Sequence, residues 1–210
     1  MLCPSGKAID VYISANDLAA LAVAKRQGRS ALRKERRGLE GLKGDDFISA
    51  AISYLFRLSS EKRAGEMLSL VRDKPPQVFW KIFLKVWSVC DCTWNVRDAF
   101  LDLLKNASAR IPAASYLSED ARELLQNLPA DLLVFRGCSR TRVNGLSWSI
   151  DPVKAMEFAV GHRSIPVPDP VLVTAKIKRK DIFAVMTERG ESEIICAPSK
   201  ILSIDRRLTG

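Results

Sequence analysis

The chain has 210 residues, a formal net charge of +9 at pH 7 and a hydrophobic content of 47%. These values fit a folded globular protein with a core of its own and exclude a disordered chain. No apolar run approaches the roughly 18–20 residues that span a bilayer, and the first residues lack the basic-then-apolar order of a secretory signal. We therefore expect no transmembrane segment and a cytoplasmic location.

The positive charge is concentrated in a predicted helix at residues 16–41. Its second half is crowded with basic residues that begin at Arg26, end at Arg37 and recur at spacings that gather them on one side of a helix. Excess positive charge attracts nucleic acid, anionic membrane surfaces or acidic protein faces without choosing among them. This basic helix is a candidate for binding an anionic partner, and a solvated helix face is the alternative.

The rest of the N-terminal part also consists of predicted helices. Phe79, Phe83 and Trp87 belong to a series of apolar positions at helical spacing, which predicts a helix with a core face. Thr93 and Ser118 suit the N-caps of two later helices. The predicted helices cover residues 16–41, 47–60, 61–73, 77–89, 93–107 and 118–128.

After Pro129 the pattern changes to short β-branched segments separated by turn residues. Among them we predict one helix, at residues 151–160, with Asp151 as its N-cap and Pro152 at its first position. The predicted strands cover residues 131–137, 144–149, 169–177, 181–186, 192–197 and 200–206. We expect an α+β fold in which an all-helical N-terminal half, residues 1–128, packs on a small, mostly antiparallel sheet, residues 129–210.

The five cysteines and the single histidine form no recognisable metal-binding pattern. Cys90 and Cys92 are too close together for a usual zinc knuckle, and no matching second pair follows. His162 has no set of ligands near it in the sequence. We expect reduced, mostly packed thiols and no metal.

Three small polar motifs interrupt the predicted strands, and the first is Arg136-Gly137. Arg136 ends an apolar run, where an arginine needs an anionic partner, and its planar guanidinium suits phosphate oxygens. Gly137 lets a flat ligand approach the backbone closely. The alternative is an arginine that pairs internally with a carboxylate.

The second motif is Ser147-Trp148-Ser149. Alternate side chains of a strand share a face, so both hydroxyl groups point to one side and the indole to the other. The sequence therefore predicts that Trp148 enters the core while Ser147 and Ser149 line a cleft. Ordinary alternation in an edge strand is the alternative.

The third motif contains Glu191 and Glu193. In an extended segment the two carboxylates face the same side, roughly 7 Å apart at about 3.3 Å per residue. They precede Ile194 and Ile195, which we expect in the interior. Like charges at the edge of an apolar strand are unfavourable unless they serve a function. A solvent-facing edge is the alternative.

Together and in this order, the motifs at Arg136, Ser147 and Glu193 resemble those of the Arg-Ser-Glu class of mono-ADP-ribosyltransferases, of the bacterial toxin and phage type. The resemblance covers residues 132–205. It implies a split β-sandwich whose cleft binds NAD as a co-substrate, with the nicotinamide inward and without a metal. One departure is Trp148, which stands where a threonine is more usual.

The resemblance also implies how the residues divide the binding of NAD. Arg136 would bind the phosphates or the nicotinamide ribose, and the backbone of Gly137 would bind the carboxamide. Ser147 would support the ribose and position the catalytic carboxylate, with Ser149 lining the same NAD-binding cleft. The connection from Arg136 to Ser147 is short, so the N-terminal helices would have to bind the adenine end.

The two glutamates would carry the chemistry. Glu193 would bind a ribose hydroxyl and stabilise the oxocarbenium-like charge that develops as the glycosidic bond breaks. Glu191 would orient or deprotonate the acceptor. The resemblance also implies arginine as the acceptor, because in the family a glutamate at this position often accompanies it. We therefore expect a mono-ADP-ribosyltransferase that modifies a macromolecular acceptor, a protein in preference to a nucleic acid. Two alternatives are an NAD glycohydrolase and a non-catalytic nucleic-acid-binding protein that uses the basic helix.

Overall fold

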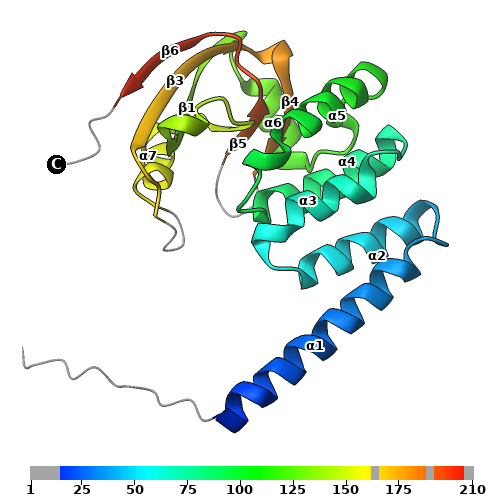
Figure 1. Ribbon diagram of the computed structural model, residues 1–210. Helices are drawn as coiled ribbons and strands as arrows, with labels where there is room; N and C mark the ends of the chain where they lie inside the picture. Colours follow the sequence, from blue (N-terminus) through cyan, green and yellow to red (C-terminus); the bar gives the residue numbers. More distant parts are fainter. Residues whose placement is uncertain (1–14, 162–165, 188–191, 206–210) are drawn as a thin grey trace, which may run out of the picture. The chain divides into compact units, whose positions relative to one another are not determined.

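A computed structural model of the protein describes residues 15–161, 166–187 and 192–205, with the backbone alone for residues 15–26 (Figure 1). The chain divides into two compact units between Lys43 and Gly44. The change from helices to strands falls later, between α6 (Glu119–Asn127) and β1 (Asp131–Ser139). The helices that follow Gly44 therefore belong to the same compact unit as the sheet.

The first unit contains α1 (Ala15–Gly38), which confirms the helix predicted there. At its end the amide of Leu39 donates to the carbonyl of Arg36, and the amide of Glu40 donates to that of Arg37. These bonds span three residues, so the helix tightens into a 3₁₀-like turn and stops short of residue 41. Exposed basic side chains of this helix include Arg29, Arg33, Lys34 and Arg37.

In the second unit, α4 (Pro76–Val86) lies at the centre of the helices. It contacts α2 (Gly44–Arg57), α3 (Ser60–Val71) and α5 (Arg97–Arg110). A short 3₁₀ turn, η1 (Trp87–Val89), continues it. The predicted apolar face of this segment is confirmed as core, because its aromatic rings are buried and pack against one another and against α5. The rings are those of Phe79, Trp80, Phe83, Trp87 and Phe100.

The two predicted N-caps of the later helices have different outcomes. Ser118 caps α6, because its Oγ accepts a hydrogen bond from the amide of Ala121 at 3.3 Å. Thr93 makes no capping bond with its side chain, and its backbone (φ −95°, ψ −14°) is helical where a cap needs an extended conformation. A 3₁₀ turn, η2 (Trp94–Val96), comes first and α5 begins only after it, so the predicted cap at Thr93 is wrong.

The described strands form one six-stranded sheet in the order β4-β5-β2-β1-β3-β6, and every neighbouring pair is antiparallel. Each strand lies where the sequence predicts one, and the α+β class is confirmed. The pairing is uneven, because β1 pairs with β3 along its whole length but with β2 at the single position Phe135–Ser149. The other strands are β2 (Ser147–Ser149), β3 (Pro170–Lys178), β4 (Ile182–Met186), β5 (Glu193–Cys196) and β6 (Ile201–Asp205).

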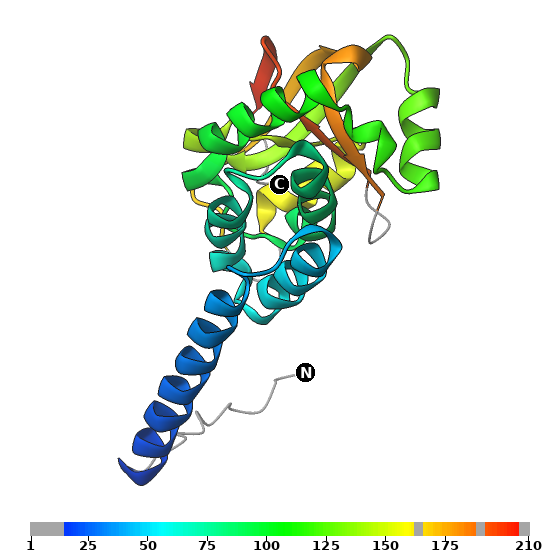
Figure 2. The ribbon, with the colours of Figure 1, turned by 90° about the vertical axis from the view of Figure 1, so that its right-hand side faces the viewer.

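One helix, α7 (Pro152–Val160), follows β2 and packs on β1, as the yellow helix shows in Figures 1 and 2. Asp151 caps it, with its Oδ1 accepting hydrogen bonds from the amides of Val153 at 2.7 Å and Lys154 at 3.4 Å. Pro152 occupies the first helical position. Both predictions for the start of this helix are confirmed.

Within the described ranges, no helix combines the length and the apolar character that a membrane crossing requires. A search of the same residues finds no group of three or more His, Cys, Asp or Glu side chains placed to hold a metal ion. The described cysteines are free thiols, of which Cys138 and Cys196 are buried, Cys90 is half-buried and Cys92 is exposed.

Candidate active site

Three neighbouring strands bring the polar motifs of the sequence together. In the order β5-β2-β1, Glu193 begins β5, Ser147 and Ser149 lie on β2, and Arg136 lies on β1. Ser149 pairs with Glu193 on one side and with Phe135 on the other. Paired residues of antiparallel strands direct their side chains to the same face, so Ser149 shares a face with Glu193 and Phe135. Arg136 is the next residue along β1, and its side chain reaches the carbonyl of Ser147. The sheet therefore places the serine motif between the other two.

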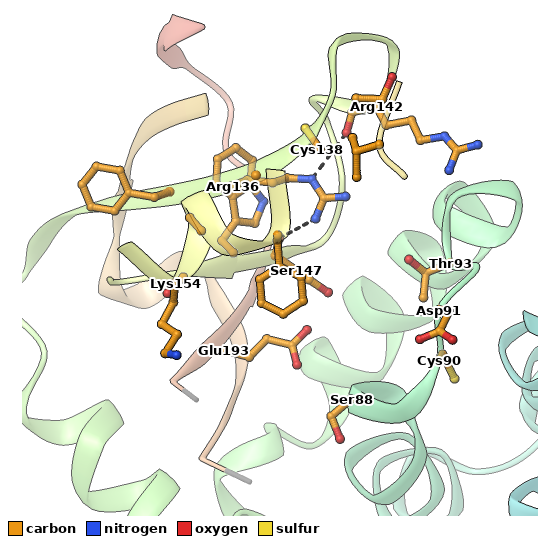
Figure 3. Close-up of a pocket in the computed structure, with 18 of the residues that line it drawn as sticks. Ser88, Cys90, Asp91, Thr93, Arg136, Cys138, Arg142, Ser147, Lys154 and Glu193 are labelled. Carbon is orange, nitrogen blue, oxygen red and sulfur yellow. Dashed lines mark hydrogen bonds between the residues drawn. The ribbon is translucent and has the colours of Figure 1, made fainter. Parts of the chain in front are cut away.

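These strands border a cavity of about 290 Å³ (Figure 3). The NAD-site residues that the sequence predicts all line it, as far as the described residues extend. They are Arg136, Gly137, Ser147, Ser149 and Glu193.

The serine motif alternates as predicted. Trp148 is 2% exposed, and its indole N–H donates to the carbonyl of Gly145 at 2.9 Å. Ser147 and Ser149 are half-buried and face the cavity. The Oγ of Ser149 accepts a hydrogen bond from the amide of Asp151 at 3.0 Å, and the Oγ of Ser147 accepts one from the indole of Trp87 at 2.9 Å. Both hydroxyl groups are thus held by neighbouring elements.

Arg136 is held by backbone carbonyl groups. Its Nη1 donates to the carbonyl of Ser147 at 2.6 Å, and its Nε donates more weakly to that of Arg142 at 3.4 Å. Its guanidinium lies against Gly145, where an added Cβ would be 2.2 Å from the Arg136 Cζ. Burial lowers the pKa of Arg136, and Glu193 is among the groups that act in the opposite direction. The side chain therefore clamps the β1–β2 connection, and carbonyl groups do not neutralise its charge.

Gly137 lines the cavity, but the need for glycine there has another cause. A Cβ at this position would lie 1.8 Å from the carbonyl oxygen of Ala155 and 2.4 Å from the amide nitrogen of Ala159, both in α7. The glycine therefore allows α7 to approach β1. Close approach of a ligand, which the sequence predicts, is not needed to explain the residue.

Glu193 is half-buried at the start of β5 and lines the cavity. In Figure 3 its carboxyl group points toward the segment that carries Ser88 and Asp91. Glu191, the other predicted carboxylate, lies outside the described residues. The predicted pairing of two carboxylates on one face therefore stays a prediction.

The opposite wall of the cavity comes from the helical part, whose contribution the sequence predicts only in general, without naming any of these residues. Trp87 and Ser88 of η1 line it, together with the residues that follow. A polar segment after a strongly apolar helix is a signal for a functional loop, but only the tertiary structure shows that it faces β2 and β5. The following lining residues are Cys90, Asp91 and Thr93.

Several hydrogen bonds from α3 hold this second wall. Ser60 donates through its Oγ to Oδ2 of Asp91, and the Asp91 amide donates to the Ser60 carbonyl at 3.2 Å. Arg63 donates through Nη1 to the carbonyl of Val89 at 2.8 Å. The segment is thus fixed at its backbone and at one carboxylate.

Cys90 has the wrong protonation state for a nucleophile. Burial raises the pKa of its thiol to about 12, and the nearby Asp91 and Glu193 carboxylates act in the same direction. The thiol also donates to the carbonyl of Val86 at 3.2 Å. Because the thiolate is the reactive form, the cavity disfavours nucleophilic chemistry by Cys90 at neutral pH.

The cavity combines cations with carboxylates. Lys154 of α7 and Arg142 of η4 (Arg140–Arg142) line it in addition to Arg136, and Asp91 and Glu193 are the carboxylates. Such a site suits a ligand that is anionic in one part and develops positive charge in another.

Comparisons with protein-family models, with curated proteins and with solved structures gave no match for this chain. The function therefore has to be inferred from the residues of the site.

Proposed function

We propose that the protein is a mono-ADP-ribosyltransferase of the Arg-Ser-Glu class, which transfers ADP-ribose from NAD to a macromolecular acceptor. The observation that carries the proposal is the meeting of Arg136, Ser147 and Glu193 from three neighbouring strands around one cavity. Arg136 and Ser147 lie on adjacent strands joined by a short connection, whereas Glu193 comes from a strand much later in the chain, so only the pairing of β5 with β2 brings this carboxylate to the other two residues. A protein acceptor is preferred, with a nucleic acid as the second choice.

The sheet is consistent with the split β-sandwich of this class. The single paired position between β1 and β2 separates a β4-β5-β2 group from a β1-β3-β6 group. The cavity lies at this weakly paired boundary, where Phe135 and Ser149 both line it. We assign the two groups of strands to the two halves of such a sandwich.

The chemistry follows from the residue types. When the bond between ribose C1′ and the nicotinamide nitrogen breaks, both electrons stay with the ring, which leaves neutral. The positive charge that develops on the ribose is stabilised by the fixed carboxylate of Glu193. The acceptor then bonds to C1′ and gives up its proton to a base, the role that we propose for Glu191. Arg136 supplies positive charge toward the phosphates.

The size of the cavity limits how much of NAD it encloses. At about 290 Å³ it is just below the range of about 300–1,000 Å³ for small-molecule pockets. We place the nicotinamide ribose within it and the adenosine along the wall of residues 87–93. In this placement the helical part binds the adenine end of NAD, because the connection before Ser147 is too short to do so.

The proposal is tested with NAD that carries a radioactive adenylate phosphate, incubated with the protein and a cell lysate. We expect label on macromolecules and release of nicotinamide. Glu193→Gln keeps the size of the side chain and removes its charge, so we expect a loss of kcat of roughly 10²–10³-fold, as for other electrostatic stabilisers. Protease and nuclease treatment of the labelled product identifies the acceptor class.

The matched control is Glu123→Gln, which makes the same change at an exposed position of α6. We expect wild-type rates from it. Free ADP-ribose as the only product would assign the protein to the NAD glycohydrolases. If the wild type neither transfers label nor releases nicotinamide, the proposal is wrong.

A further inference from the structure

We infer that Trp87 is a positioning residue of this site, which orients the hydroxyl group of Ser147 through its indole N–H. The inference rests on the proposed function of the same cavity. It gives the helical part of the second unit a role in positioning a residue of the site, in addition to its role as core.

The contact between the two side chains is short and well supported. The Nε1 of Trp87 lies 2.9 Å from the Oγ of Ser147, across 60 positions of sequence. Trp87 is 2% exposed. Its ring packs against Phe83 at 4.9 Å and against Phe100 at 5.1 Å between centroids. The indole is therefore fixed from behind and cannot turn away from the serine.

The chemistry of the two groups decides the direction of the hydrogen bonds. An indole N–H only donates, whereas a serine hydroxyl accepts at two lone pairs and donates one proton. When Trp87 occupies a lone pair of Ser147, the proton of the hydroxyl must go to another acceptor. Because Ser147 and Glu193 both line the cavity, the acceptors that we propose are the Glu193 carboxylate and an oxygen of the ligand.

The backbone of Ser147 is held from the other side. Arg136 donates to its carbonyl oxygen at 2.6 Å, so the residue is fixed by a cation at the backbone and by an indole at the side chain. Without the indole N–H, the hydroxyl group rotates among its rotamers and points its proton correctly for only part of the time. Misplaced groups of this kind lower rates by roughly 10- to 100-fold.

The test is a double-mutant cycle with Trp87→Phe, Ser147→Ala and the double variant. Trp87→Phe keeps an aromatic ring in the core and removes the N–H, so we expect kcat to fall by roughly 10-fold or more with little change in KM. If Trp87 acts through Ser147, it has no further effect on kcat once Ser147 is alanine.

Trp80→Phe is the matched control. Trp80 is also fully buried in α4 and donates to the carbonyl of Ile111 at 2.8 Å, but it does not line the cavity. The Trp80→Phe variant also loses an indole N–H from this aromatic cluster, so we expect its Tm to fall about as much as that of Trp87→Phe. Its kcat should stay close to that of the wild type.

Thermal unfolding of the four proteins of the cycle, which are the wild type, the two single variants and the double variant, gives a second measurement that does not depend on activity. Ser147→Ala leaves a buried indole N–H without its partner, so we expect a lower Tm, part of which the added Trp87→Phe recovers. Losses in kcat that multiply in the double variant, or an equal loss in Trp80→Phe, overturn the inference while the proposed function stands. A wild type without NAD chemistry overturns both, even where the Tm values confirm the hydrogen bond.

Discussion

Gly145 and Gly137 both face groups that leave no room for a methyl group. A Cβ on Gly145 would lie 2.2 Å from the Arg136 Cζ, and one on Gly137 would lie 1.8 Å from the Ala155 carbonyl oxygen. The two positions differ in what can move. The guanidinium is the end of a flexible side chain, whereas Ala155 belongs to the backbone of α7. A substitution at Gly145 therefore changes the site without breaking the fold.

This difference yields a prediction for Gly145→Ala. The added methyl group displaces the Arg136 guanidinium from the carbonyls of Ser147 and Arg142, and we expect the KM for NAD to rise roughly 10-fold. Steady-state release of nicotinamide measures it. The matched control is Gly65→Ala in α3, where nothing lies within 4 Å of the added carbon. That change stabilises the helix by about 1 kcal/mol and leaves KM unaltered. Equal KM values in the two variants would contradict the prediction.

Among single residues, those of the strands were the most predictable. Ser147 and Ser149 face the cavity and Trp148 the core, because side chains alternate along a strand whatever surrounds it. Gly137 shows the limit of such reasoning. Its sequence context predicts close approach of a ligand, but the packing shows that the group closest to Gly137 is the backbone of α7.

Among the elements, α7 connects the serine motif to one cation of the cavity, Lys154. Its cap, Asp151, lies two residues after the end of β2, and the Asp151 amide donates to the Oγ of Ser149. Lys154 and Ala155 on its first turns line the cavity. The cap of this helix therefore supports one wall of the site.

We predict that Asp151→Ala lowers the free energy of unfolding by about 1 kcal/mol, because the amides of Val153 and Lys154 lose their acceptor. Denaturant unfolding measures the loss. Fraying of the first turn of α7 also loosens the wall that carries Lys154, so NAD should bind more weakly in calorimetry. Ser118→Ala removes the cap of α6, which contributes no residue to the cavity, and should lower stability by a similar amount with unchanged NAD binding. Equal NAD affinities in the two variants would argue against a role of the cap in the site.

The elements themselves could be predicted where the pattern is local. The apolar spacing of α4, the alternation of β2 and the Asp-Pro start of α7 all depend on neighbours in sequence. The predicted start of α5 is wrong, because threonine is a residue type that often caps helices but the backbone of Thr93 is itself helical. The residues of the wall at 87–93 were missed because their partners on β2 and β5 are distant in sequence.

At the scale of the whole molecule, the net charge of +9 includes the exposed basic side chains of α1, which belong to a compact unit of their own. The hypothesis that this basic helix binds an anionic partner gives a quantitative expectation for nucleic acid. Replacing Arg29, Arg33, Lys34 and Arg37 by glutamine should weaken binding to duplex DNA or RNA. It should also reduce the slope of log K against log salt by up to about 0.9 for each lost phosphate contact. Fluorescence anisotropy at several salt concentrations measures both.

The control for this prediction removes four exposed basic residues from the second unit, so that both variants have the same net charge. These residues are Lys62, Arg72, Lys105 and Arg110. Equal salt slopes in the two variants would show that only overall charge matters. Transferase activity toward a small acceptor should be unchanged in both, since none of the replaced residues lines the cavity.

The residues that line the cavity are spread along the chain from Trp87 to Glu193. The site can therefore be complete only late in synthesis of the chain. During synthesis from the N-terminus, the helical wall and the β1–β2 connection leave the ribosome before β5 exists. Contacts between distant parts of a chain form late, because closing a long loop must precede them. Glu193, the proposed catalytic carboxylate, is thus the last of these residues to be made, and on the proposed function we expect the growing chain to be inert toward NAD until β5 pairs with β2. The proposed transferase would therefore be inactive toward macromolecules while its chain is still attached to the ribosome.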